Sequence, residues 1–201
     1  FEGSRVTAYA RPETLDQALG LLAGGDLRVL AGGTDLYPAV PGGLAGPVLD
    51  LGGIAGLSGI VAGDDLRIGA ATTWTTIAEA SLPLGLRALQ QAARQVGGRQ
   101  VQNAGTIGGN LCNASPAADG VPPLLAAGAE VELVSAAGRH RLPLGDFLQG
   151  PRRTALLPGE ILAAVEQERI SRRKHDPSFP FDAPATVLEV IENDSLTLTL
   201  I

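Results

Sequence analysis

The sequence predicts an α+β fold built as two lobes, a small α/β lobe followed by a larger mixed, mostly antiparallel lobe. Three observations lead to this prediction. A helical period and two short apolar runs fill residues 14–51, and pairs of apolar runs joined by turn residues follow between residues 57 and 144. Two glycine-threonine segments separate these regular parts. A helix-containing start followed by hairpins is typical of an α+β arrangement.

The small lobe is expected to contain one helix and two strands. Apolar residues recur at the spacing of one helical face from Thr14 to Leu22, and Thr14 and Gln17 have the spacing of a capping box. The runs at 28–31 and 47–51 are short and apolar, which is typical of buried strands. Together they predict a small α/β unit of about fifty residues, near the lower size limit for a separate core.

The larger lobe is expected to contain two hairpins and several helices. Its apolar runs flank turn residues, and within residues 129–134 apolar and polar side chains alternate as far as Leu133. The expected elements are a hairpin of 57–62 with 66–70, a short helix near 71–77, a helix with its inner face at 86–96, a short helix starting at Ser115 with Pro116 in its first position, and a hairpin of 129–134 with 139–144.

Two glycine-threonine segments are the candidate functional parts of the chain. Ala31-Gly-Gly-Thr-Asp-Leu36 follows an expected strand, and Gly105-Thr-Ile-Gly-Gly-Asn110 follows about seventy residues later. Glycine lets a ligand approach the backbone without meeting a Cβ, and successive N–H groups in a turn can bind an anion. Either segment alone could be a plain turn. Because there are two, we hypothesise that they hold the two ends of one pyrophosphate.

Composition and charge exclude several classes of function. The net charge of −6 and the pI near 4.9 disfavour nucleic acid as a partner, because no basic face is available to neutralise its phosphates.

Cys112 is the only cysteine, so the chain alone forms neither a disulfide nor an iron–sulfur cluster; we expect it to be a small buried residue. His140 and His175 are expected at the surface, and no metal site is predicted. No apolar run approaches the roughly 18 residues of a membrane span, which favours a cytoplasmic location.

Four motifs in order carry a resemblance to a known family. They are Ala31 to Leu36, Gly69-Ala-Ala-Thr-Thr-Trp74, Gly105 to Asn110 with Ala114-Ser-Pro-Ala-Ala-Asp119, and Arg153-Thr-Ala-Leu-Leu-Pro-Gly-Glu-Ile-Leu162. Together they resemble the FAD-binding subunit of the molybdenum hydroxylases, a group that includes xanthine dehydrogenase and aerobic carbon monoxide dehydrogenase. The resemblance implies a two-lobed FAD-binding fold. The implied domains are a small lobe at 1–56, a larger lobe at 57–165 and the start of a C-terminal domain at 166–201.

The resemblance also implies a cofactor site. The residues that it assigns to FAD are Ala31, Gly32, Gly33, Thr34, Asp35, Leu36, Thr106, Ile107, Gly108, Gly109, Asn110, Asp119 and Leu162. The two glycine segments would wrap the pyrophosphate, largely through backbone N–H groups, with Thr34 and Thr106 adding hydroxyl donors. Asp119 would contact polar groups of the cofactor and Leu162 would lie against the flavin. Asp35 carries a charge that repels phosphate, so we expect its side chain to turn away.

Some of these residues have simpler interpretations. Asp119 could favour the positive end of a helix dipole instead, and Trp74 is expected to serve packing. No catalytic side chain is predicted, because a flavin performs the redox chemistry itself. Replacing Gly108 or Gly109 by Val is expected to abolish cofactor retention while leaving most of the fold intact.

The implied function is electron transfer within a larger enzyme. Electrons would leave a molybdenum-cofactor large subunit, cross the iron–sulfur clusters of a 2Fe-2S small subunit, reach the FAD of this chain and pass to NAD or oxygen. Two alternatives remain open. One is a stand-alone two-lobed FAD oxidase, which commonly links its flavin covalently through His or Cys; neither histidine lies in a glycine turn. The other is a non-redox nucleotide-binding or assembly module.

Overall fold

The computed structural model describes residues 9–39, 46–63 and 65–168. These residues belong to one compact unit that ends at Glu168. Residues 195–201, whose alternating pattern is typical of a strand, lie outside the described residues, as do His175 and most of the C-terminal domain expected at 166–201. The boundaries proposed at 56/57 and 165/166 stay predictions, and strand β10 continues through the second of them to Glu168.

The small lobe is a three-stranded parallel sheet with one helix. Its strands pair in the order β1-β3-β2. Thr14 caps helix α1 by accepting a hydrogen bond from the Gln17 N–H at 3.3 Å, and the Gln17 side chain accepts from the Glu13 N–H at 3.0 Å. The elements are β1 (Tyr9–Ala10), α1 (Leu15–Ala23), β2 (Arg28–Leu30), β3 (Val48–Asp50) and the 3-10 turns η1 (Leu51–Gly53) and η2 (Ala55–Leu57).

The larger lobe is built on a five-stranded antiparallel sheet in the order β4-β5-β10-β6-β7. Strand β10, the last described element, lies between the two predicted hairpins and joins them into one sheet. The elements are β4 (Ile60–Ala62), β5 (Asp65–Gly69), α2 (Trp74–Glu79), η3 (Leu84–Leu86), α3 (Arg87–Gln95), α4 (Arg99–Ala104), α5 (Ile107–Asn113), α6 (Val121–Ala126), β6 (Glu130–Ser135), β7 (Gly138–Pro143), α7 (Leu144–Phe147), β8 (Leu148–Gly150), β9 (Arg153–Thr154) and β10 (Ile161–Glu168).

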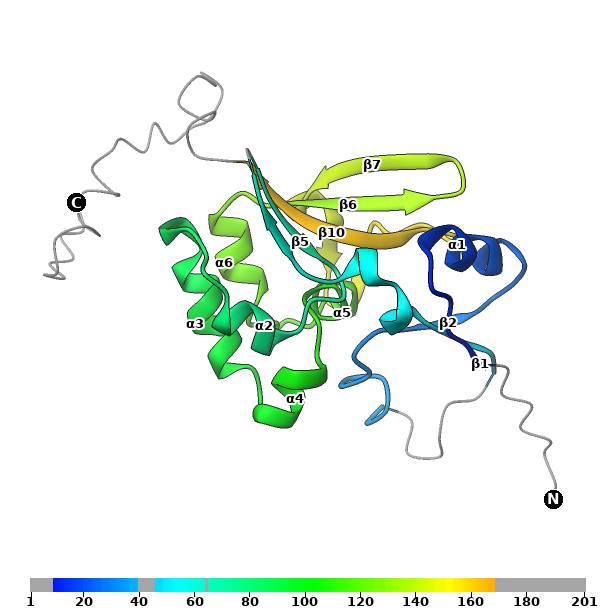
Figure 1. The fold of residues 1–201 in the computed structure, drawn as a ribbon, viewed down its shortest axis with the longest axis horizontal. Coiled ribbons are helices and arrows are strands. Elements are labelled where there is room, and N and C mark those ends of the chain that lie inside the picture. The colour runs from blue at the N-terminus through cyan, green and yellow to red at the C-terminus, as the bar shows by residue number, and fades with distance from the viewer. Residues whose placement is uncertain (1–8, 40–45, 64, 169–201) are drawn as a thin grey trace, which may run out of the picture. The chain divides into compact units, whose positions relative to one another are not determined.

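The large sheet separates two hydrophobic cores. Helices α2, α3, α4 and α6 lie together on one side, while α1 and the small sheet lie toward the other end of the molecule (Figure 1). Val131 and Leu133 of β6 join the core that contains the helices. Val134 of the same strand, with Ile161 and Ala163 of β10, joins the core that contains α1 and β3. The alternation of β6 therefore attaches the small lobe to the large sheet.

The predicted helix at Ser115 is wrong. Residues 115–120 form turns, with the Ala118 N–H donating to the Ser115 carbonyl, and the helix α6 begins at Val121 with proline in its first turn. Proline suits a helix start, and Pro122 fills that role instead of Pro116. The glycine segment that was expected to be a turn also differs, because Gly108 and Gly109 lie inside helix α5.

Candidate functional site

The second glycine segment forms the start of helix α5. Thr106 is the N-cap, and its hydroxyl accepts a hydrogen bond from the Gly109 N–H at 3.1 Å. The other N–H groups of the first turn also have partners in the chain: Ile107 donates to the Thr72 carbonyl, Gly108 to the Ala70 carbonyl and Asn110 to the Thr106 carbonyl. The fold itself therefore uses the backbone donors that were expected to bind a phosphate.

Gly105 and Gly108 are required by close packing and not by positive φ. Gly105, Gly108 and Gly109 are absent from the positive-φ residues of the described chain. A Cβ on Gly108 would lie 2.7 Å from the Ala70 carbonyl oxygen, whereas one on Gly109 would meet only the Thr106 hydroxyl, at 3.0 Å. Because a side chain at Gly108 meets the Ala70 backbone, Gly108→Val is expected to lower stability as well as cofactor retention. For Gly109 the expectation that the fold stays intact stands as a prediction.

The first glycine segment, residues 31–36, leaves its backbone donors free. It follows β2, and Gly33 has a φ of +69°, which a residue with a side chain adopts only with strain. Across the described residues, the N–H groups of 32–36 have no hydrogen-bond acceptor within the chain. The bend contributes an acceptor to the chain's own hydrogen bonds, since the Gly33 carbonyl accepts from the Tyr37 N–H at 3.0 Å. Within the part of the chain that the structure describes, the bend therefore presents five free backbone donors.

The two glycine segments are in direct contact. A Cβ on Gly32 would lie 1.9 Å from the Ala104 carbonyl oxygen, so the backbones touch there. A Cβ on Gly105 would lie 3.3 Å from the Thr34 hydroxyl. Thr106, whose hydroxyl retains a proton to donate, follows directly. The structure thus brings the bend at 31–36 to the N-cap of α5, as the hypothesis of one shared site requires.

The remaining predicted residues differ in exposure. Asp35 and Asp119 are exposed. The Asn110 Oδ1 atom is buried and has no hydrogen-bond partner in the described chain, and a Cβ on Gly120 would lie 3.1 Å from it. Leu162 is only 4% exposed and packs in the main core, so protein already covers its side chain.

Solvent exposure can be compared with the sequence-based expectation for three residues outside the predicted site. Cys112 was expected to be a buried core residue; the residue as a whole is exposed, while burial raises the pKa of its thiol to about 12. Trp74 is buried, as expected of a packing residue. His140 is exposed, with its Nδ1 atom 3.8 Å from the Glu160 carboxylate.

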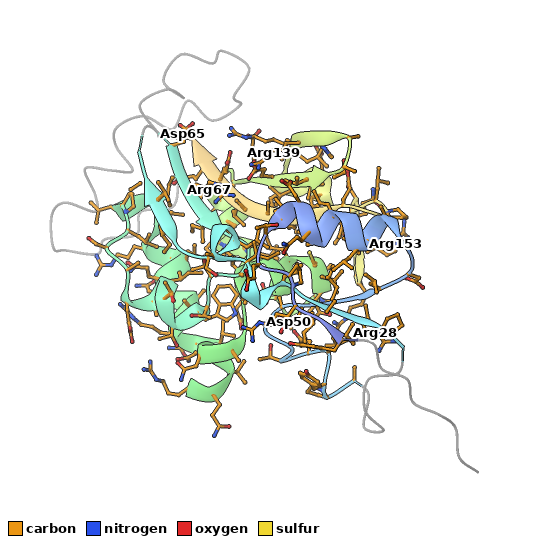
Figure 2. The ribbon with its side chains drawn as sticks, turned by 45° about the vertical axis from the view of Figure 1, so that its right-hand side comes forward. Arg28, Asp50, Asp65, Arg67, Arg139 and Arg153 are labelled. Atoms are coloured by element: carbon orange, nitrogen blue, oxygen red, sulfur yellow. The ribbon has the colours of Figure 1, made fainter. Side chains whose placement is uncertain are left out.

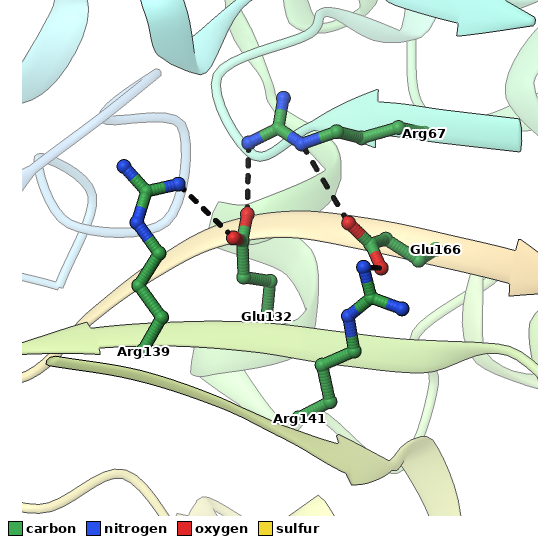
Figure 3. A network of polar contacts seen from close by, with 5 residues as sticks. All are labelled: Arg67, Glu132, Arg139, Arg141 and Glu166. Atoms are coloured by element: carbon green, nitrogen blue, oxygen red, sulfur yellow. Dashed lines mark hydrogen bonds and ion pairs between the residues drawn. The ribbon is translucent and has the colours of Figure 1, made fainter.

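A network of charged side chains lies on the large sheet (Figure 3). Glu132 pairs with Arg67 at 2.9 Å and with Arg139 at 3.2 Å, and Glu166 pairs with Arg141 at 2.5 Å and with Arg67 at 3.7 Å. Burial alone would raise the pKa of Glu132, but hydrogen bonds and charges from both arginines hold it below its ordinary value. Burial raises the pKa of Glu166, and the charge of Arg141 offsets this only in part. Sequence patterning gave no signal for this network, because its members come from four strands.

A cavity of about 270 Å³ lies beside this network, between the start of α1, the η2 turn, Arg67 and Arg139. Figure 2 shows both arginines on the same side of the sheet, near α1. None of the predicted cofactor residues lines the cavity. Within the described ranges, no group of three His, Cys, Asp or Glu residues is placed to hold a metal ion, and no helix is long and apolar enough to cross a bilayer.

The geometry at the bend suits a diphosphate ligand. Five free N–H groups and two threonine hydroxyls are hydrogen-bond donors, and glycine backbone permits close approach. The buried, unpartnered carboxamide oxygen of Asn110 is an acceptor that needs a donor, since an unsatisfied buried polar atom costs about 1–3 kcal/mol. FAD carries a diphosphate together with several hydrogen-bond donors, so the residues present fit that cofactor.

Comparisons with known proteins agree with this fit. Residues 4–166 match the family model described as the FAD binding domain in molybdopterin dehydrogenase. The chain is 37% identical over 163 residues to the xanthine dehydrogenase FAD-binding subunit of Escherichia coli O157:H7, covering 78% of this chain and 56% of that protein. It is 36% identical to the carbon monoxide dehydrogenase medium chain of Afipia carboxidovorans, covering 78% and 57%. The chain therefore spans a little over half the length of these relatives.

Solved structures share the fold. A Cu,Mo-CO dehydrogenase structure matches with a TM-score of 0.75 at 33% identity, covering 81% of this chain and 59% of that one. Quinoline 2-oxidoreductase from Pseudomonas putida 86 matches with a TM-score of 0.73 at 28% identity, covering 81% and 59%. Both the bend at 31–36 and the α5 segment lie within the region that matches the family. The chain belongs to the FAD-binding domain family of the molybdopterin dehydrogenases.

Proposed function

We propose that this chain is the FAD-carrying, electron-transferring part of a molybdenum-containing hydroxylase or dehydrogenase, and hence an oxidoreductase component. The observation that carries this proposal is the bend at 31–36, which has five free N–H groups in the described chain and lies against the N-cap of α5. Family membership supports FAD as the ligand. When bound, FAD supplies the redox chemistry, accepting and releasing electrons.

The residues of the bend hold the diphosphate. The N–H groups of Gly32, Gly33 and Thr34 donate to its oxygens, and the hydroxyls of Thr34 and Thr106 add two further donors. Asp35 is exposed, and its carboxylate is expected to turn away from the phosphates because its charge would repel them. The backbone of the α5 segment borders the site but offers few hydrogen-bond donors, because the N–H groups of its first turn already donate to acceptors within the chain.

The partners in this proposal are a molybdenum-cofactor large subunit and a 2Fe-2S small subunit, with NAD or oxygen as the electron acceptor. The names of the relatives support a shared assembly, since they include FAD-binding subunits and medium chains. One cysteine cannot ligate an iron–sulfur cluster, so residues 1–201 do not hold the clusters of this proposal.

The test is an absorption spectrum of the purified protein, followed by acid release and identification of the flavin. We expect about one FAD per chain, and loss of most of it in Thr34→Val, which removes a donor without changing the side-chain volume much. Thr14→Val serves as the control, because Thr14 is exposed and its hydroxyl accepts from the Gln17 N–H at the start of α1, outside both glycine segments. A wild-type protein that neither carries nor rebinds FAD would refute the proposal.

A further inference from the structure

We propose that Trp74 is a positioning residue for the FAD site, because its one indole ring separates two glycines that border the ligand groups. This inference rests on the function proposed above. Trp74 is 2% exposed and is the single tryptophan of the chain. It is buried too deeply to contact a cofactor, so it acts through its neighbours.

The backbone of Trp74 is tied to the α5 segment. Its N–H donates to the Gly105 carbonyl at 3.2 Å. The preceding residue, Thr73, forms an isolated antiparallel bridge with Thr106, and the Ile107 N–H donates to the Thr72 carbonyl at 3.0 Å. The start of α2 is therefore held in register with the N-cap of α5, and the direction of the indole ring is fixed relative to the site.

The indole ring contacts two glycines with opposite ends. A Cβ on Gly105 would lie 3.2 Å from the Cδ1 atom of the ring. A Cβ on Gly120 would lie 2.5 Å from Cη2 and 3.4 Å from Cζ2. Because Cδ1 and Cη2 are at opposite ends of a rigid bicyclic group, the ring sets the separation of the two backbone segments.

Each glycine borders a ligand-facing group on another side. Gly105 lies next to the Thr34 hydroxyl, which would be 3.3 Å from a Cβ at that position. Gly120 lies next to the Asn110 Oδ1 atom, which has no partner in the described chain and would be 3.1 Å from a Cβ on Gly120. The exposed Asp119 directly precedes Gly120. The ring thus fixes the distance between the bend at 31–36 and the Asn110 and Asp119 side, the two groups of residues that would hold FAD in this proposal.

The first test separates positioning from general stability. Trp74→Leu is compared with Phe147→Leu, a fully buried aromatic residue in the same core. We would remove the flavin from the purified full chain, then measure the melting temperature of each apo-protein and titrate each with FAD. Both variants are expected to melt lower, but only Trp74→Leu should weaken FAD binding, by about tenfold or more, equivalent to about 1.4 kcal/mol.

The outcomes are distinct. If the wild type binds FAD and Trp74→Leu binds it within about twofold, the inference is overturned while the proposed function stands. If the wild type itself does not bind FAD, the proposed function fails first. Should Trp74→Leu not fold, Trp74→Phe takes its place: its shorter ring retains the Gly105 end but does not reach Gly120, and a weaker but measurable loss of affinity is expected.

A second test uses the space that the ring occupies. In the wild type, Gly120→Ala would place its Cβ 2.5 Å from the indole, so it should lower FAD affinity. In the double variant Trp74→Phe/Gly120→Ala, the shorter ring should leave room for the alanine side chain, so part of the FAD affinity should be recovered. The effects of the two substitutions on FAD affinity would then be coupled, which a simple loss of stability does not produce. Strictly additive effects on FAD affinity would contradict direct positioning by this ring.

Discussion

The two glycine-threonine segments have similar sequences but use their backbones differently. In the bend at 31–36, five N–H groups have no acceptor in the described chain. In the α5 segment, four N–H groups donate to Thr72, Ala70 and Thr106. The glycines also differ, since Gly33 needs its positive φ while Gly108 needs close contact with Ala70. A glycine-rich motif therefore indicates a backbone segment that other atoms approach closely. Only its hydrogen bonds show whether the backbone donors are free for a ligand or already paired within the protein.

The largest expected effect is at the contact between the two segments. Gly32→Ala places a Cβ 1.9 Å from the Ala104 carbonyl oxygen, a backbone atom that cannot rotate away. We expect the free energy of unfolding to fall by about 3 kcal/mol, the upper range for overpacking, and FAD to be lost. Gly25→Ala is the matched control, because nothing lies within 4 Å of its Cβ position. Denaturant unfolding of both variants checks this, and an unchanged Gly32→Ala would mean that the segments do not touch.

The next comparison separates the two glycines of α5. Gly108→Ala should lower the free energy of unfolding by about 2 kcal/mol, because its Cβ would meet the Ala70 backbone at 2.7 Å. Gly109→Ala should leave stability nearly unchanged, since alanine favours a helix and meets only the Thr106 hydroxyl at 3.0 Å. Its effect should appear in FAD affinity instead. Equal destabilisation by both substitutions would show that the N-terminal turn of α5 is packed differently.

A substitution in the charge network tests a position outside both glycine segments. Glu132→Gln should lower the free energy of unfolding at pH 7 by about 1.5 kcal/mol, the scale of a hydrogen bond to a charged group, without changing FAD affinity. Because the folded-state pKa of Glu132 is lowered, its contribution is present above its ordinary value of 4.5 and is lost as the pH falls through the folded-state pKa.

Glu166→Gln should cost less at pH 7 than Glu132→Gln. The folded-state pKa of Glu166 is raised, so its favourable contribution is present below 4.5 and is lost as the pH rises through the folded-state pKa. Urea unfolding of both variants between pH 3 and pH 7 measures the difference. A Glu132→Gln deficit that grows toward low pH would contradict the assigned direction.

The smallest expected effect compares two helix caps. Thr106→Ala and Thr14→Ala each remove a hydroxyl that accepts from an N–H three residues later. Each should lower the free energy of unfolding by about 1 kcal/mol. Only Thr106→Ala should also weaken FAD binding, because Thr14 caps α1, outside the predicted cofactor residues. Titration of both apo-proteins with FAD tests this, and equal affinities would remove the Thr106 hydroxyl from the site.

Local sequence patterns predicted the elements that depend only on residues close together in the sequence. The period and cap of α1 and the alternation within β6 were recognised from local spacing, and β7 was recognised as the partner of β6 across the turn at 136–138. The adjacency of the two glycine segments was also hypothesised correctly. Family resemblance supplied the ligand, which neither segment specifies by itself.

Other features depend on contacts distant in sequence. Helix α5 was missed because Gly108 and Gly109 disfavour a helix, and the Ala70 backbone, some forty positions earlier, stabilises it. Strand β10 was missed as the centre of the sheet, since its partners β5 and β6 come long before it. The role of Trp74 depends on the spacing of Gly105 and Gly120, which only the folded chain reveals.

The most direct test is amide hydrogen exchange of the purified chain with and without FAD. We predict that the N–H groups of residues 32–36 exchange rapidly in the apo-protein and slow by about tenfold or more with FAD, because a diphosphate gives them acceptors. The N–H groups of 107–110 should be protected in both states, since the fold already pairs them. If FAD binds and residues 32–36 exchange as fast as before, the bend does not hold the diphosphate.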